Sequence, residues 1–127
     1  MSFEKLTVGL TSTKTYKVEK EHIANFLGSG AVAVLSTPSM ILFMENTARL
    51  LAQEHLTDPW TTVGTHVDIY HLKPANVGST VAVTATLQKV DNKKLTFSVL
   101  ATCNNEKIGE GIHDRYIVNK EKFMSKK

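Results

Sequence analysis

The sequence predicts an α+β fold in which an antiparallel sheet of about five strands wraps around one long central helix. Two observations lead to this prediction. The first is the segment 36–56, whose apolar residues surround its first two predicted turns instead of forming one stripe. The second is a series of shorter segments in which apolar and polar residues alternate between turn residues. A sheet with one apolar face can bury both surfaces by curling around such a helix.

The central helix is predicted from its ends as well as from its apolar residues. Ser36 and Thr37 both suit an N-cap position, and Pro38 suits the first helical turn. Because the residue before a proline avoids helical dihedral angles, Thr37 is favoured as the cap. The helix is expected to end before Asp58, which is followed by a proline.

One carboxylate, Glu45, stands among the apolar residues of this helix. Carboxylates are rarely buried unless they are paired or have a chemical role, so Glu45 is a candidate functional residue. The alternative is a structural carboxylate that is satisfied by a nearby hydroxyl, such as that of Thr47, or by a partner subunit.

The chain before this helix is expected to contribute one strand. Residues 11–18 are rich in threonine and aromatic residues, and their weak apolar pattern predicts a strand at or near the edge of the sheet. Residues 19–27 suit a short helix, Gly28-Ser29-Gly30 suits a flexible corner, and residues 31–35 lead into the central helix.

The chain after the helix predicts four further strands, which follow a loop at Pro59-Trp60. They cover residues 61–72, 80–90, 95–103 and 107–118, with turns at 73–79, 91–93 and 104–105. In the first of them, one face carries Thr65, Val67, Ile69 and His71, and the other carries His66, Asp68, Tyr70 and Leu72. The short turns indicate antiparallel neighbours.

A helix enclosed by a curled antiparallel sheet is the architecture known as the hotdog fold. At 127 residues the chain is expected to form a single domain, 1–127, with one core. Strands of about ten residues cannot cover every side of the helix. A homodimer or higher oligomer is therefore predicted.

Composition excludes several classes of function. The net charge of +3 equals the charge of residues 119–127, which hold four lysines and one glutamate, so the rest of the chain is neutral and no nucleic-acid surface is indicated. No apolar run is long enough to cross a membrane, and residues 1–10 do not resemble a signal peptide. The single cysteine, Cys103, fits a reducing cytoplasm and suits a small core position.

The chain resembles the hotdog thioesterases typified by fluoroacetyl-CoA thioesterase. The resemblance rests on Thr37 ahead of the central helix, Glu45 eight residues later, Gly64-Thr65 opening the next strand, and His71 seven residues after that glycine. The closing segment 109–115, GEGIHDR, is also similar, and the likeness extends over residues 11–123.

The resemblance implies hydrolysis of an acyl-CoA or acyl-carrier thioester without a metal or cofactor beyond the coenzyme A of the substrate. Thr37, Glu45 and His71 would form the catalytic set, and the Gly64 amide would contact the thioester carbonyl. In the family, a phenylalanine-bearing lid precedes the catalytic threonine. Here that region holds only Phe26, so acyl-CoA hydrolysis is carried over and fluoroacetyl specificity is not.

The residues keep alternative interpretations open. Thr37 could be a plain N-cap and His71 a core histidine, while His66 on the opposite face is expected to be exposed. Arg115 is a candidate for binding a coenzyme A phosphate, although a surface arginine is the simpler interpretation. The segment 109–111 suits close packing of strands better than nucleotide binding.

Hydrolysis needs a nucleophile or activated water, a base, and donors for the oxyanion, which the predicted set could supply. One geometric difficulty remains, because a helix that starts at Pro38 separates Thr37 from Glu45 by ~12 Å along its axis. Either substrate lies between them, or they meet across a dimer, or the helix starts late. Two other functions remain open: a non-catalytic acyl-CoA-binding sensor, and a hotdog hydratase or dehydratase.

Overall fold

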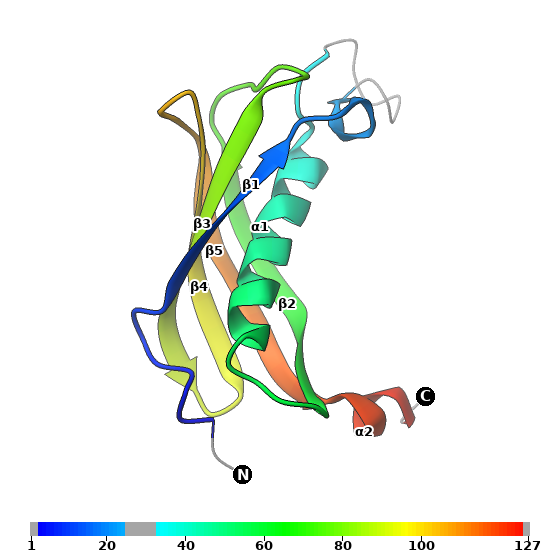
Figure 1. Cartoon of the computed structure of the whole chain (residues 1–127), viewed down its shortest axis with the longest axis vertical. Helices are drawn as coiled ribbons and strands as arrows, with labels where there is room; N and C mark the ends of the chain where they lie inside the picture. Colours follow the sequence, from blue (N-terminus) through cyan, green and yellow to red (C-terminus); the bar gives the residue numbers. More distant parts are fainter. Residues whose placement is uncertain (1–2, 25–32, 126–127) are drawn as a thin grey trace.

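The computed structural model of the protein describes residues 3–24 and 33–125. Its elements in chain order are β1 (Thr11–Lys17), the 3-10 turn η1 (Lys20–His22), α1 (Thr37–Gln53), β2 (Trp60–His71), β3 (Thr80–Asp91), β4 (Lys94–Cys103), β5 (Glu106–Asn119) and α2 (Lys120–Ser125). The strands form one antiparallel sheet in the order β1-β3-β4-β5-β2, and α1 crosses one face of it (Figure 1). The predicted α+β architecture of five strands and one long helix is therefore confirmed.

The core lies between α1 and the concave face of the sheet. The inward side chains of β3 and β4 are those predicted from their alternation, and all are buried: Val81, Val83, Ala85, Leu87, Leu95, Phe97, Val99, Ala101 and Cys103. They join Met40, Phe43 and Met44 of α1 in one cluster. The turns at 91–93 and 104–105 are also as predicted, because Asn92, Asn104 and Asn105 adopt the positive φ angles of tight hairpins.

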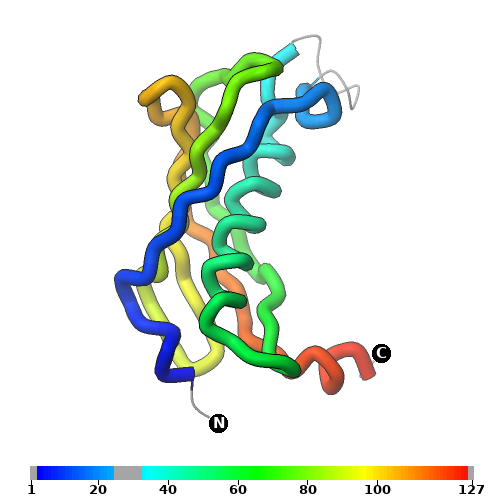
Figure 2. Tube along the Cα trace, in the orientation of Figure 1, coloured from blue at the N-terminus to red at the C-terminus, as the bar shows by residue number. Residues whose placement is uncertain are grey.

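The order of the strands differs from the prediction at one place. Short turns suggested that β2 and β3 are neighbours, but β2 pairs with β5, and β3 pairs with β1 and β4. The connection 72–79 is not a tight turn. It spans the ends of two strands, a distance of about 14 Å that eight residues easily cover. As a result, β1 forms one edge of the sheet and β2 forms the other (Figure 2).

The strand β2 contains a β-bulge. Gly64 pairs with Arg115 and His66 pairs with Asp114, so Thr65 has no opposite residue. An extra residue in one strand interrupts the alternation of faces. Gly64 and His71, an odd number of residues apart, therefore both face α1.

The ends of α1 differ from the prediction. The N-cap is Ser36, whose side chain accepts a hydrogen bond from the Ser39 amide at 3.2 Å, so the prediction that Thr37 is the cap is wrong. The helix ends at Gln53 rather than Leu56, because the amides of His55 and Leu56 bond carbonyls three residues back and tighten the last turn.

The helix is enclosed on one side only in a single chain. Its buried residues face the sheet, whereas Leu42 is 57 % exposed. The predicted short helix at 19–27 is reduced to η1 in its described part, and the predicted Gly28-Ser29-Gly30 corner lies outside the described residues. In the described part of the chain, no helix is both long and apolar enough to cross a membrane.

Candidate active site

The structure divides the five predicted site residues into two groups. Thr37 and His71 form one group, at the start of α1 and the end of β2. Glu45, Gly64 and Arg115 form the other group, in the middle parts of α1, β2 and β5. Seven residues of extended strand separate Gly64 from His71, which is about 23 Å.

The first group is joined by a hydrogen bond. Thr37 Oγ1 and His71 Nδ1 lie 2.7 Å apart. Since Ser36 caps the helix, the Thr37 side chain is available for this contact, and the alternative of a plain N-cap threonine is wrong. A hydroxyl in contact with an imidazole is an arrangement in which the ring can accept or return the hydroxyl proton.

The His71 imidazole is held in its neutral form. Burial lowers its pKa below the ordinary 6.5, an effect that the Lys73 backbone opposes in part. Its other nitrogen, Nε2, is buried and has no hydrogen-bond partner among the described residues. A neutral imidazole can act as a general base at neutral pH.

An open cleft of about 440 Å³ lies against this pair. Its lining comes from three stretches of the chain: Ala24; Val34, Leu35, Ser36, Thr37 and Pro38; and His71, Leu72, Lys73 and Pro74. Volumes of this size are typical of small-molecule sites. The cleft opens at the N-terminus of α1, where the helix dipole favours partial negative charge.

The second group surrounds Gly64. A Cβ atom on this glycine would lie 3.2 Å from Glu45 Oε2, 3.2 Å from His113 Cε1 and 3.3 Å from Arg115 Nη1. These three side chains therefore border the space directly above the Gly64 backbone. A missing side chain allows a ligand atom to approach the backbone there.

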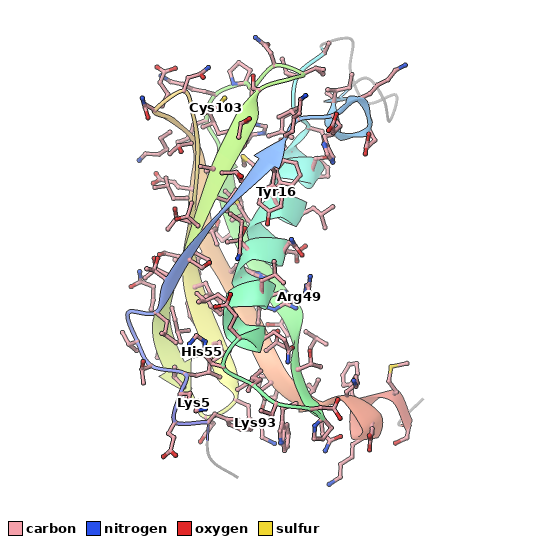
Figure 3. The ribbon with its side chains drawn as sticks, viewed as in Figure 1. Lys5, Tyr16, Arg49, His55, Lys93 and Cys103 are labelled. Atoms are coloured by element: carbon pink, nitrogen blue, oxygen red, sulfur yellow. The ribbon has the colours of Figure 1, made fainter. Side chains whose placement is uncertain are left out.

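The Glu45 carboxylate accepts no hydrogen bond from the described residues. The alternative partner considered above, Thr47, instead donates to the Phe43 carbonyl at 2.8 Å. The Thr47 hydroxyl also lies 2.9 Å from that of Tyr16, which reaches α1 from β1 (Figure 3). The nearest charges to Glu45 are electrostatic neighbours rather than bonded partners, chiefly Arg115.

Arg115 is not the surface arginine of the simpler interpretation, because it is only 6 % exposed. Its Nε donates to Thr62 Oγ1 at 2.8 Å and its Nη2 donates to the Thr62 carbonyl at 3.1 Å. Burial lowers its pKa, while the Glu45 charge raises it. A guanidinium held inward in this way is placed beside Glu45 rather than toward an external phosphate. Its role in substrate binding stays a prediction.

His113 is a member of the site that the sequence analysis did not single out. It is fully buried on β5, and its Nε2 lies 3.1 Å from Arg115 Nη1. The signal for it was present in the sequence, because His113 and Arg115 occupy the same face of β5 as Gly109 and Gly111. Two polar side chains on the strand face that is turned toward an apolar helix indicate a candidate site rather than a core.

The remaining candidates behave as expected. His66 is exposed on the outer face, where its Nδ1 lies 3.3 Å from Asp114 Oδ2. Close strand packing explains the glycines of β5, since a Cβ on Gly109 would meet Met40 and one on Gly111 would meet the Asp68 carbonyl. Residues 3–24 and 33–125 contain no group of three histidine, cysteine or acidic side chains that could hold a metal ion.

The distance between the two groups narrows the alternatives for Thr37 and Glu45. The helix begins at Thr37, so the alternative of a late start is excluded and the two residues are ~12 Å apart along its axis. Either the substrate spans both groups, or the groups meet between two copies of the chain.

Comparison with known proteins identifies relatives over most of the chain. Residues 18–121 match the model of a family described as fluoroacetyl-CoA-specific thioesterase. The fluoroacetyl-CoA thioesterase of Streptantibioticus cattleyicolor is 31 % identical over 93 residues, which are 73 % of this chain and 67 % of that protein.

Solved structures of similar fold also cover most of the chain. A crystal structure of the fluoroacetyl-CoA thioesterase FlK superposes with a TM-score of 0.89 and 27 % identity, covering 95 % of this chain and 94 % of that one. A Thermus thermophilus protein described as a thioesterase superfamily member gives a TM-score of 0.87 and 26 % identity, over 94 % of this chain and 88 % of that one. A hot-dog-like protein from Thermanaerovibrio acidaminovorans, at 21 % identity and a TM-score of 0.89 over 98 % of this chain and 93 % of that one, shows the same fold.

Proposed function

The chain belongs to the family of fluoroacetyl-CoA-specific thioesterases, and on that premise we propose that it hydrolyses a small acyl-CoA thioester to a free acid and a thiol. The single observation that best supports this activity is the 2.7 Å contact between Thr37 and His71 at the edge of an open cleft. A hydroxyl and a neutral imidazole in contact are the parts that acyl transfer uses.

The second group supplies the electrostatic part of the reaction. A water oxygen, or the Glu45 carboxylate, attacks the thioester carbonyl carbon, and the carbonyl oxygen takes on negative charge. The Gly64 backbone and the nearby Arg115 guanidinium are placed to stabilise that charge. If water attacks, Glu45 or His71 takes its proton and returns it to the thiolate when the carbon–sulfur bond breaks. If Glu45 attacks, the thiolate leaves and an acyl anhydride forms on Glu45. A water molecule then cleaves this anhydride to the free acid and the Glu45 carboxylate, and its proton passes through His71 to the thiolate. No cofactor other than the coenzyme A of the substrate is needed for these steps.

A homodimer is part of the proposal, because β2 and α1 each leave an apolar surface uncovered. The outer edge of β2 has no neighbouring strand, and Val67 near its middle is 39 % exposed. Leu42 of α1 is 57 % exposed, and α1 and β2 lie next to each other in the fold (Figure 1). Unpaired edges and apolar helix faces are commonly covered by a second copy.

A two-fold axis at this surface would join the two groups into one site. The midpoint between Gly64 and His71 on β2 falls at Val67 and Asp68, and the midpoint between Thr37 and Glu45 on α1 is Ile41. An axis near both midpoints places Gly64 and Glu45 of one copy level with His71 and Thr37 of the other. The same exposed surface thus supports both the dimer and a shared site.

A panel of acyl-CoA and acyl-carrier thioesters tests the activity. We expect repeated release of free thiol, measured with a thiol reagent at equal substrate concentrations. The sole cysteine of the chain, Cys103, is buried and adds at most a fixed background. Saturable binding without thiol release beyond that background would support a non-catalytic binding protein and overturn the proposal. Fluoroacetyl-CoA belongs in the panel, because the Streptantibioticus cattleyicolor relative is named as a fluoroacetyl-CoA thioesterase.

A further inference from the structure

His113 is buried beside the predicted machinery and is not among the residues that line the cleft. It is fully enclosed, and each of its ring nitrogens meets one defined partner. Nδ1 lies 2.9 Å from the His66 carbonyl oxygen, and Nε2 lies 3.1 Å from Arg115 Nη1.

The identity of these partners fixes the protonation of the ring. A carbonyl oxygen can only accept, so Nδ1 carries the proton and donates it to the His66 carbonyl. A guanidinium nitrogen can only donate, so Nε2 is unprotonated and accepts from Arg115. The two contacts together require the neutral, Nδ1-protonated tautomer.

The Arg115 guanidinium is held at each of its three nitrogens. Thr62 accepts hydrogen bonds from Nε and Nη2, and His113 accepts one from Nη1. Nη1 is also the nitrogen nearest Gly64, 3.3 Å from the position that a Cβ would occupy there. The Thr62 contacts fix the plane of the guanidinium, and the contact with His113 is the hydrogen bond that Nη1 itself makes beside the Gly64 backbone.

We infer that His113 is a positioning residue: as a neutral hydrogen-bond acceptor, it holds Arg115 Nη1 at Gly64 and beside Glu45 for the thioester reaction. The inference rests on the proposed function. A fixed donor at the point where charge develops stabilises a transition state more than a mobile one does, because it needs no reorganisation during the reaction. His113 acts through Arg115 and does not itself contact the substrate.

The charges around His113 agree with a neutral ring. Burial and the Arg115 charge lower its pKa, whereas the His66 carbonyl, Glu45 and Asp114 raise it, and the net effect is a lowered pKa. A protonated ring would lose its acceptor and would present a cation to the Arg115 guanidinium.

The first test needs no substitution. Nitrogen-15 chemical shifts of the His113 imidazole at pH 7 distinguish a protonated nitrogen from an unprotonated one. We expect Nδ1 to be protonated and Nε2 unprotonated. Protonation at Nε2 would overturn the inference, because that nitrogen could then not accept from Arg115.

The second test uses two isosteric amides. The His113→Asn side chain ends near the Nδ1 position and loses the acceptor for Arg115, whereas His113→Gln reaches the Nε2 position and keeps it. We expect His113→Asn to lower kcat/KM by at least ~10-fold and His113→Gln to lower it less. Equal losses in the two variants would indicate packing alone and would overturn the inference.

A double-mutant cycle separates positioning from stability. Arg115→Lys keeps the charge but loses the planar guanidinium that His113 orients. In that background we expect His113→Asn to change kcat/KM by less than ~2-fold, since the partner it acts through is gone. A full His113→Asn loss in both backgrounds would overturn the inference. An unmodified protein that releases no thiol from any thioester would instead refute the proposed function, while the nitrogen-15 result would still stand by itself.

Discussion

The Thr37 hydroxyl and the His71 imidazole lie 2.7 Å apart although 34 residues separate them in the chain. The contact joins the first residue of α1 to the last residue of β2. Both side chains are thereby fixed by the ends of regular elements rather than by a loop. Side chains carried by helices and strands are positioned more precisely than side chains on loops.

The two histidines of β2 should differ in their effect on the rate. A general base contributes about 10²–10⁴-fold, so His71→Ala is expected to lower kcat by that range. His66→Ala, on the outer face beside Asp114, should change kcat less than ~10-fold. Both variants are compared with the unmodified protein by thiol release, after circular dichroism has confirmed folding. Equal losses would mean that the two faces of β2 are assigned incorrectly.

The rate should fall at acid pH, with a midpoint below 6.5. The imidazole of His71 can accept a proton only when it is neutral, and burial lowers its pKa from 6.5. Lowering the pH through the folded-state pKa protonates the ring, so kcat/KM is retained at neutral pH and is lost progressively below that pKa. The dependence of kcat/KM on pH over the acid range measures this loss, because kcat/KM reports the pKa values of the free enzyme. A loss of rate with its midpoint above pH 6.5 would contradict the assignment of His71 as the base.

Alanine at Gly64 should reduce activity while the fold survives. The new Cβ would lie 3.2–3.3 Å from atoms of Glu45, His113 and Arg115, so these side chains would have to shift by a few tenths of an ångström. We expect a loss of at least ~10-fold in kcat/KM with a small change in melting temperature. Gly111→Ala is the contrasting variant, because its Cβ would meet backbone atoms of Asp68 and Ile69, which cannot move without breaking the sheet. If both variants lose folding alike, the glycine at position 64 is required for packing rather than for the reaction.

A mixing experiment tests whether the site is shared. Glu45→Ala should be inactive with unchanged or slightly raised stability, since an unpaired carboxylate is removed from a partly buried position. His71→Ala should be nearly inactive as well. In a shared site, a dimer of one copy of each variant contains one intact site, so unfolding and refolding an equal mixture should restore about a quarter of full activity. No restoration would place the site within one chain.

Sedimentation of the same samples provides the control for the mixing experiment. A dimer mass with no restored activity would leave the homodimer in place and reject the shared site. A 14.0 kDa species at micromolar concentration would reject the homodimer itself.

The sequence predicted the elements whose physical cause is local. Alternation in residues 80–90 and 95–103 determined which side chains are buried, and asparagine turns determined the hairpins. The pairing of β2 with β5 could not be obtained in this way, because it depends on where an eight-residue connection goes. The choice between Ser36 and Thr37 as cap also depended on a distant residue, since His71 contacts the hydroxyl of Thr37.

The site was predicted in part for the same reason. The resemblance placed Thr37, Glu45, Gly64 and His71 correctly on elements that face α1 or belong to it, but it did not reveal that they fall into two groups. The burial of Arg115 was missed because the positions of charged residues in the sequence do not show how far a side chain lies from solvent. Its enclosure follows from contacts with Thr62 on a neighbouring strand, which no local pattern contains.

The unpaired Thr65 makes the spacing of β2 informative for comparing related sequences. In a regular strand, a glycine and a histidine seven residues apart lie on opposite sides, whereas the two lie on the same side when they are six residues apart. A relative with a spacing of seven therefore needs a bulge between the two residues to assemble this site, and a relative with a spacing of six needs a strand without one. An alignment that matches every site residue by type describes a comparable site only where the spacing and the bulge agree in this way.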